Sequence, residues 1–349
     1  MNDDVLREII IHADILSVFR FCQVNKTLCH QHDDLFQHIY QRLYNHTSMV
    51  VFKNNTMTWY QLIKQCYLLE QLRVTLPILN EYSIKELYNL QRLDLYNQKI
   101  KVLPPEMGQL GALQYLDLSN DKLSALPPEM GQLSALQYLY LFHNQLSALP
   151  PEIGQLRALQ YLYLNHNQLS ALPPEMGQLS HLRYLNLSNN QLSALPPEIG
   201  QLRALQYLYL NHNQLSALPP EIGQLGALQQ LNLSYNQLSA LPMEIGQLCH
   251  LQYLCLSNNQ LSALPPEMDQ LSHLQRLVLD NNQLGALPPE MCHLIHLKYL
   301  YLINNQLSAL PPEMGQLGDL QYLDLSHNYL SREYINELRY LLPNTNLFY

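Results

Sequence analysis

The stretch EIGQLRALQYLYLNHNQLSALPPE occupies residues 152–175 and returns, letter for letter, at residues 198–221. The two copies lie 46 residues apart, which is twice a period of 23 residues that runs through most of the chain. A fixed period of about 20 to 50 residues is typical of solenoids and related repeat architectures. The unit LxxLxLxxNxLxxLPxxIxxLxx starts, without insertion, at Leu90, Leu113, Leu136, Leu159, Leu182, Leu205, Leu228, Leu251, Leu274, Leu297 and Leu320.

Each unit predicts one short strand followed by a turn. In the segment LQYLDL, Leu116 and Leu118 alternate with polar neighbours, which is the period of a strand with one buried face. The strand cannot continue through the Pro127–Pro128 pair, because proline lacks an amide donor and fixes φ. We therefore expect an extended turn after each strand. Its inward-pointing side chains in this unit are predicted to be Leu126, Met130 and Leu133.

One such unit cannot bury its leucines alone, but neighbours stacked about 4.8 Å apart form a parallel sheet over a continuous core. The pattern resembles the leucine-rich-repeat family, in its short form with Leu-Pro in each unit, from about residue 84 to the end of the chain. The resemblance implies an α/β solenoid, a horseshoe with a parallel β-sheet on its concave side. We expect a small all-helical module before it.

The ninth residue of the unit predicts a ladder of stacked asparagines that hydrogen-bond the backbone of adjacent turns. It is asparagine from Asn144 to Asn328. The first two units carry Gln98 and Asp121 there instead, which indicates a frayed or specialised entrance.

The chain is predicted to have four parts. They are a helical module (residues 1–45), a helical connector (46–83), an eleven-unit solenoid (84–330) and a C-terminal cap (331–349). The SIKELYNL segment at residues 83–90 predicts a half-repeat without a strand of its own.

Helix signals mark the connector and the cap. Residues 58–61, Thr-Trp-Tyr-Gln, form a potential capping box, and Trp59 begins an apolar helix face on which it serves as core or, alternatively, as a ligand contact. Ser331 is predicted to cap a helix that ends before Pro343, and the final NLFY to add an edge strand. The apolar face of the connector helix is formed by Trp59, Leu62, Ile63, Cys66 and Leu69. That of the cap helix is formed by Ile335, Leu338 and Leu342.

Variation among the units points to a binding surface on the concave face. The third, fifth, seventh and eighth residues of each unit point outward, and in the units from Leu136 to Leu205 they are rich in Tyr and His. Tyrosine is favoured at interfaces because it offers a large contact area and a polar tip. The alternative is that the tyrosines are copied with the repeat and only stabilise the sheet. The predicted partner-binding set is Tyr138, Tyr140, Phe142, His143, Tyr161, Tyr163, His166, Tyr184, Tyr207, Tyr209 and His212.

The sequence offers little for catalysis or metal binding. His143 and His166 occupy equivalent positions, but no carboxylate or cysteine converges on them, and repeat duplication would produce the pair anyway. Cys255, at an outward position, has no evident base beside it, and no P-loop, G-x-S-x-G or G-x-G-x-x-G motif occurs. We predict no metal, no cofactor and no enzymatic activity.

Composition excludes several partners. Charged residues make up 13% of the 349 residues, against roughly 25% in an average domain, and the net charge of −9 provides no basic surface for nucleic acid. The first residues lack a basic region before an apolar run, so neither a signal peptide nor a membrane span is expected. The six cysteines show no paired spacing, which favours free thiols in a reducing, cytoplasmic compartment.

Residues 3–44, DDVLREIIIHADILSVFRFCQVNKTLCHQHDDLFQHIYQRLY, resemble an F-box, the helical module that docks the Skp adaptor of cullin-type ubiquitin ligases. The sequence departs from that family at Met1-Asn2 (usually Leu-Pro), at Ala13 (usually Leu), and at Leu28 and Phe36 (usually Trp). The alternative is a small helical cap for the first repeat. The adaptor-binding residues that the resemblance implies are Val5, Leu6, Ile9, Val18, Val24 and Phe36.

These features together predict a non-catalytic adaptor. By resemblance to F-box proteins with leucine-rich repeats, the module would bind Skp and the concave face would present a protein target for ubiquitination. The near-identical units beside an F-box-like head also resemble secreted effectors of intracellular bacteria, which would act in the host cytoplasm. The alternative function is a binding scaffold whose N-terminal helices are only a cap.

Overall fold

The structure, a computed structural model, describes residues 59–349, with side chains from residue 64 onward. The F-box-like residues Val5, Leu6, Ile9, Val18, Val24 and Phe36 therefore lie outside the described residues, as do Thr58 and the side chains of Trp59, Leu62 and Ile63. The chain divides into two compact units.

The first unit contains the described residues 59–90 together with residues 104–112. Cys66 and Leu69 on its longest helix are fully buried, as the periodicity predicts, and burial raises the pKa of the Cys66 thiol to about 12. Its helices, with η for a 3-10 helix, are α5 (Trp59–Thr75), η2 (Pro77–Glu81), α6 (Ile84–Tyr88) and η3 (Pro105–Gln109).

A capping box starts α6, where we predicted a half-repeat without a strand. The Ser83 hydroxyl accepts a hydrogen bond from the Glu86 amide at 3.2 Å, and the Glu86 carboxylate accepts one from the Ser83 amide at 2.7 Å. These two bonds satisfy amides that a helix start otherwise leaves without partners.

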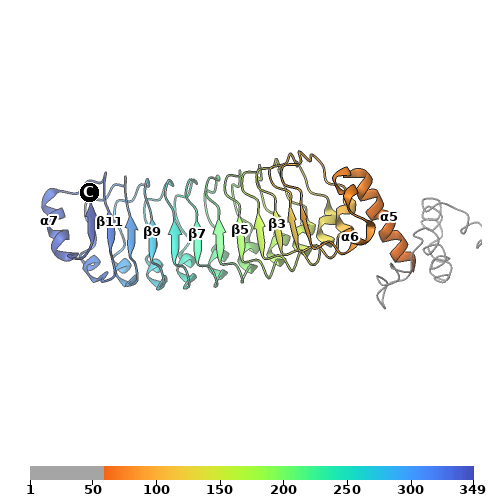
Figure 1. Ribbon diagram of the computed structural model, residues 1–349. Coiled ribbons are helices and arrows are strands. Elements are labelled where there is room, and N and C mark those ends of the chain that lie inside the picture. Colours follow the sequence, from red (N-terminus) through yellow and green to blue (C-terminus); the bar gives the residue numbers. More distant parts are fainter. Residues whose placement is uncertain (1–58) are drawn as a thin grey trace, which may run out of the picture. The chain divides into compact units, whose positions relative to one another are not determined.

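The second unit, residues 91–103 and 113–349, is the predicted α/β solenoid. Its twelve strands form one parallel sheet in chain order, and each strand pairs in register with the next (Figure 1). The central leucine of β1 to β11 is buried. The strands are β1 (Arg92–Asp94), β2 (Tyr115–Asp117), β3 (Tyr138–Tyr140), β4 (Tyr161–Tyr163), β5 (Tyr184–Asn186), β6 (Tyr207–Tyr209), β7 (Gln230–Asn232), β8 (Tyr253–Cys255), β9 (Arg276–Val278), β10 (Tyr299–Tyr301), β11 (Tyr322–Asp324) and β12 (Asn346–Phe348).

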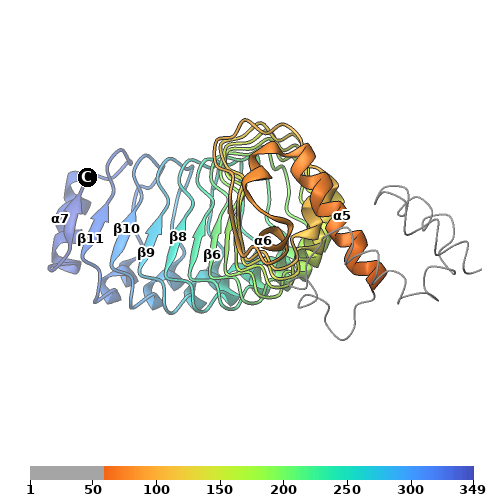
Figure 2. The same cartoon turned by 45° about the vertical axis from the view of Figure 1, so that its right-hand side comes forward.

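The turn after each strand differs in part from the prediction. In the second unit of the repeat, Pro127 is extended, but Pro128 starts a 3-10 helix, because proline's fixed φ suits the first position of a helix. Leu126, Met130 and Leu133 are buried, as predicted. These short helices line the side of the solenoid opposite the strands (Figure 2). They are η4 (Pro128–Gln132), η5 (Pro151–Gln155), η6 (Pro174–Gln178), η7 (Pro197–Gln201), η8 (Pro220–Gln224), η9 (Met243–Gln247), η10 (Pro266–Gln270), η11 (Pro289–His293) and η12 (Pro312–Gln316).

The asparagine ladder is present and joins each turn to the one before it. Asn144 Oδ1 accepts a hydrogen bond from the Leu123 amide at 3.0 Å, and its Nδ2 donates to the carbonyls of Leu118 and Leu141 at 2.8 and 3.1 Å. The same three bonds recur at each later ninth residue through Asn328. A buried amide with all these partners stabilises the solenoid without leaving polar groups unpaired.

Asp121 stands in this ladder with a carboxyl in place of the amide. Its Oδ1 accepts the Ile100 amide at 2.9 Å, but its buried Oδ2 has no hydrogen-bond partner among the described residues. Burial raises the pKa of the Asp121 carboxyl, although backbone amides of residues 98–100 act in the opposite direction.

Asp121→Asn is therefore expected to stabilise the protein by about 1 to 2 kcal/mol at pH 7. Because the carboxyl pKa of Asp121 is raised in the folded chain, protonated Asp121 stabilises the fold at pH values below the usual aspartate pKa of about 4. This contribution to the free energy of unfolding is lost as the pH rises through the folded-state pKa. The gain should therefore shrink at acidic pH. Thermal melting across pH measures it, and Asn144→Asp is the inverse control. A gain that does not change with pH would contradict this account.

The C-terminal cap matches the prediction. Ser331 accepts a hydrogen bond from the Tyr334 amide and starts α7 (Arg332–Leu341), and Leu342 follows the helix before Pro343. The side chains of Ile335, Leu338 and Leu342 are buried. β12 then pairs with β11 as an edge strand.

Candidate functional site

Strand alternation places a row of tyrosines on the outward, concave face of the sheet. The third and fifth residues of each unit flank the buried central leucine, so their side chains point away from the core. The predicted tyrosines are half-buried there, packed against one another and still open to a partner. We define the tyrosine surface as Tyr115, Tyr138, Tyr140, Tyr161, Tyr163, Tyr184, Tyr207 and Tyr209.

The rings stack between neighbouring strands. Tyr138 and Tyr161 have ring centroids 4.9 Å apart with planes 7° apart, and Tyr140 and Tyr163 are separated by 4.6 Å and 10°. In-register pairing is the cause, because it places equivalent side chains one strand spacing apart. Parallel rings in contact contribute beyond the area they bury, about 0.5–1.5 kcal/mol per pair.

Tyr184 connects this stacked block to the next strand. Its ring centroid lies 4.7 Å from Tyr163 and 5.4 Å from Tyr209, and Tyr207 is 6.0 Å away. Tyr115 extends the surface at the other end, 5.2 Å from Tyr140. The eight rings therefore form one continuous cluster over β2 to β6.

Burial raises the pKa of Tyr140, Tyr184 and Tyr209, and raises that of Tyr163 to about 12. Neighbouring tyrosines add to the effect at Tyr163, since a phenolate among them would be poorly solvated. The hydroxyl groups remain hydrogen-bond donors throughout the physiological pH range.

The predicted histidines flank this surface where the strands end. His143, His166 and His212 each have φ near +55°, the left-handed region, at the eighth residue of the unit. His143 and His166 stack at 4.1 Å between centroids with planes 10° apart. Burial, followed by the neighbouring histidines, lowers the pKa of His166. Among the described residues, no group of three or more His, Cys, Asp or Glu side chains is placed to hold a metal ion.

Two expectations from the sequence are corrected. Phe142, expected to be exposed, is half-buried, and its ring meets His143 edge-on at 5.7 Å. Cys255, expected to face outward, is buried, with its Sγ 3.4 Å from the Ser257 hydroxyl. Cys66, Cys249, Cys255 and Cys292 are free thiols.

The sequence analysis assigned no role to two arginines that lie over tyrosine rings on this face of the sheet. The Arg92 guanidinium carbon lies 3.6 Å above the Tyr115 ring centroid, and Arg276 lies 4.9 Å from that of Tyr301. Both arginines occupy the third position of their units, so the repeat alignment itself was the signal.

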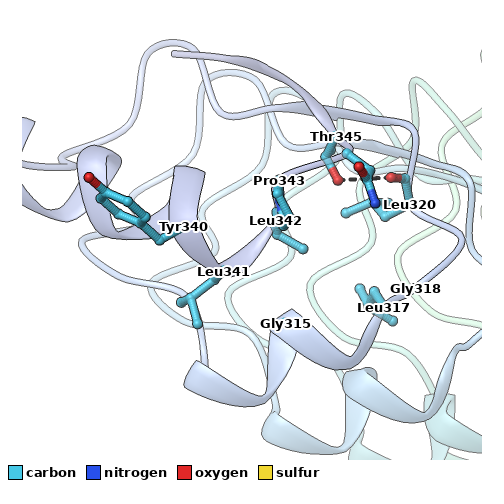
Figure 3. A pocket seen from close by; sticks show the side chains of 10 residues that line it. Gly315, Leu317, Gly318, Leu320, Tyr340, Leu341, Leu342, Pro343 and Thr345 are labelled. Atoms are coloured by element: carbon cyan, nitrogen blue, oxygen red, sulfur yellow. Dashed lines mark hydrogen bonds between the residues drawn. The ribbon is translucent and has the colours of Figure 1, made fainter.

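A separate hollow of about 340 Å³ lies at the C-terminal cap, away from the tyrosine surface. Figure 3 shows it beside the end of α7, where Thr345 donates a hydrogen bond to the Leu320 carbonyl at 2.8 Å. Apart from Tyr340, no titratable side chain lines it, so it offers no acid–base chemistry. Its lining residues are Gly315, Leu317, Gly318, Leu320, Tyr340, Leu341, Leu342, Pro343, Asn344 and Thr345.

In the described part of the chain, no helix is both long and apolar enough to cross a membrane.

Family models match most of the repeat array. The model described as "Leucine rich repeat" matches residues 88–146, 226–284 and 272–330. "Leucine-rich repeat region" matches residues 174–237, and "Leucine Rich repeats (2 copies)" matches residues 134–175. A comparison with curated proteins finds no match.

Several solved structures are similar to this chain. A leucine-rich-repeat protein of Leptospira interrogans is 33% identical, over 77% of this chain and 98% of its own, with a TM-score of 0.39. An internalin of Listeria monocytogenes is 22% identical (80% and 86% covered, TM-score 0.61). The ectodomain of the Arabidopsis thaliana receptor kinase GASSHO1/SCHENGEN3, in complex with CASPARIAN STRIP INTEGRITY FACTOR 2, is 27% identical over 74% of this chain (TM-score 0.53). The chain spans 38% of that ectodomain.

Proposed function

The chain belongs to the leucine-rich-repeat family, and on that premise we propose that its tyrosine surface is the binding site for a protein partner. Proteins with this fold are typically non-catalytic interaction scaffolds, and the Arabidopsis ectodomain is in complex with a second molecule. The observation that carries the proposal is the continuous cluster of half-buried tyrosines over β2 to β6.

The fold itself does not require these tyrosines. β7 pairs with both neighbours in the same register, yet it presents Gln230 and Asn232 at the two outward positions. β8 and β9 carry Cys255 and Val278 at the fifth position. Because the sheet forms equally well with small or polar residues there, the concentration of tyrosine over β2 to β6 supports a role in binding rather than sheet stability alone.

Replacing both Tyr140 and Tyr163 by alanine is expected to weaken partner binding by about 2 kcal/mol or more, since aromatic side chains at the centre of an interface carry much of its affinity. The measurement is calorimetric titration of a ligand selected on the full chain from a random peptide display library. Tyr329→Ala with Tyr340→Ala is the matched control, because both of these tyrosines are exposed and lie outside the surface. Equal affinity for all three proteins would mean that the tyrosines are structural.

The finer proposal concerns residues 1–45 and rests on their resemblance to an F-box. The module would dock the Skp adaptor of a cullin-type ubiquitin ligase, while the tyrosine surface holds the target. Tethering raises the effective concentration of target lysines near the ligase. Such a chain would act in the cytoplasm, and as a bacterial effector it would act in the host cytoplasm.

Leu6→Asp is expected to abolish saturable binding of the full chain to purified Skp, because a charge would replace an aliphatic side chain that the F-box resemblance assigns to the adaptor contact. The Tyr140→Ala/Tyr163→Ala chain should bind Skp normally. Absence of binding by the unaltered chain at micromolar concentration would leave residues 1–80 as a cap and the protein as a scaffold.

A further inference from the structure

The tyrosine surface is neutral in the middle and acidic at one end. From β3 to β6 the outward positions carry no Asp, Glu, Lys or Arg. On β1 and β2, Asp94 and Asp117 pair in register on the same face. Arg92, 3.7 Å from Asp94, is the one cation at the outward positions of these two strands. This end therefore has two carboxylates and one guanidinium.

Arg92 is already engaged. It pairs with Asp94 and covers the Tyr115 ring, so Asp117 has no ion-pair partner among the described residues. Asp117 Oδ1 accepts the Ser119 amide at 2.9 Å, and its Oδ2 lies 3.5 Å from the Tyr115 hydroxyl. A partly covered carboxylate without a cation, in a chain of net charge −9, favours a positively charged partner group at this point.

The stacking also restricts what the middle of the surface can bind. Parallel rings cover one another's faces, so a partner from outside meets ring edges and hydroxyl groups. The hydroxyls of Tyr140 and Tyr163 make no hydrogen bond within the described residues. A sugar ring needs an open aromatic face, whereas a peptide backbone supplies a row of carbonyl acceptors for phenol donors.

We propose that the tyrosine surface binds an extended basic peptide segment, with a Lys or Arg side chain at Asp94 and Asp117 and its backbone across the tyrosine hydroxyls. This proposal rests on the function proposed above. Strands lie about 4.8 Å apart, so the four steps from β2 to β6 span about 19 Å, the length of about six extended residues.

The test uses the full chain and a random dodecapeptide display library as the probe. The variant is Asp94→Asn with Asp117→Asn, which removes two charges while keeping the shape. The change at residue 117 should preserve the fold, because Asn186 and Asn232 accept the amides of Ser188 and Ser234 at 3.0 Å in the same role. Asp269→Asn with Asp319→Asn is the control, since it removes two charges outside the tyrosine surface.

Peptides selected on the unaltered chain are expected to carry Lys or Arg near one end. They should bind the Asp94→Asn/Asp117→Asn chain at least tenfold more weakly at low salt and the control chain equally well, with thermal melting confirming that all three fold. Selected peptides without basic residues, or with equal affinity for the variant, would overturn this inference and leave the proposed function standing. If the unaltered chain enriches peptides no more than the Tyr140→Ala/Tyr163→Ala chain does, both this inference and the proposed function are overturned.

Discussion

Replacing Asn213 by alanine is expected to destabilise the protein by about 3 kcal/mol or more, because each buried polar group left unpaired costs about 1–3 kcal/mol. Asn213 Nδ2 donates to the carbonyls of Leu187 and Leu210, and its Oδ1 accepts the Leu192 amide, all at 3.0 Å. Alanine removes all three bonds at a position that is 8% exposed, so water cannot replace them.

The matched control is Asn211→Ala, two residues earlier on the outward side. Its side chain makes no hydrogen bond within the described part of the chain, so a change of less than about 0.5 kcal/mol is expected. Urea unfolding followed by circular dichroism measures both variants. Because repeat arrays lose cooperativity, amide hydrogen exchange at Leu192 reports whether the loss is local. Equal stability of the two variants would refute the role assigned to the ladder.

Gly223→Ala is the second large effect, with an expected loss of about 2–3 kcal/mol from overpacking. A Cβ at this position would lie 2.5 Å from the Glu244 carbonyl oxygen in the next turn, a backbone atom that can move only if the turn moves. The spacing between successive turns therefore depends on this glycine.

Gly226→Ala is its control, three residues further on. A Cβ there meets no heavy atom within 4 Å, so we expect no loss, or a gain of about 0.4–1 kcal/mol from a less flexible unfolded chain. Thermal melting of the two single variants compares them directly. Asp269 and Cys292 occupy the position equivalent to Gly223 in two later units, so the spacing there accommodates a side chain. A Gly223→Ala protein as stable as the Gly226→Ala protein would show that every turn adjusts in this way.

Much of the fold could be predicted from residue order alone. The strict 23-residue period indicates stacked repeats, and leucine at every second residue indicates a strand with one buried face. Because a Pro-Pro pair ends that strand in most units, few arrangements other than stacked parallel strands remain. The asparagine ladder and the Ser331 cap were equally accessible, because each depends on a local pattern. The 3-10 helices were missed, because a Pro-Pro pair ends a strand and predicted only an extended turn, although the fixed φ of proline also suits the first position of a helix.

For the candidate site, the sequence by itself determined which side chains point outward, because a strand's alternation fixes the face of every residue. Only the tertiary structure decided what those side chains do there. The stacking of Tyr140 on Tyr163 depends on neighbours supplied by adjacent turns, and so does the pairing of only one Asp121 carboxylate oxygen, which accepts the Ile100 amide. The physical reason is that burial and pairing arise from side chains about 23 residues apart, which meet only when the turns stack.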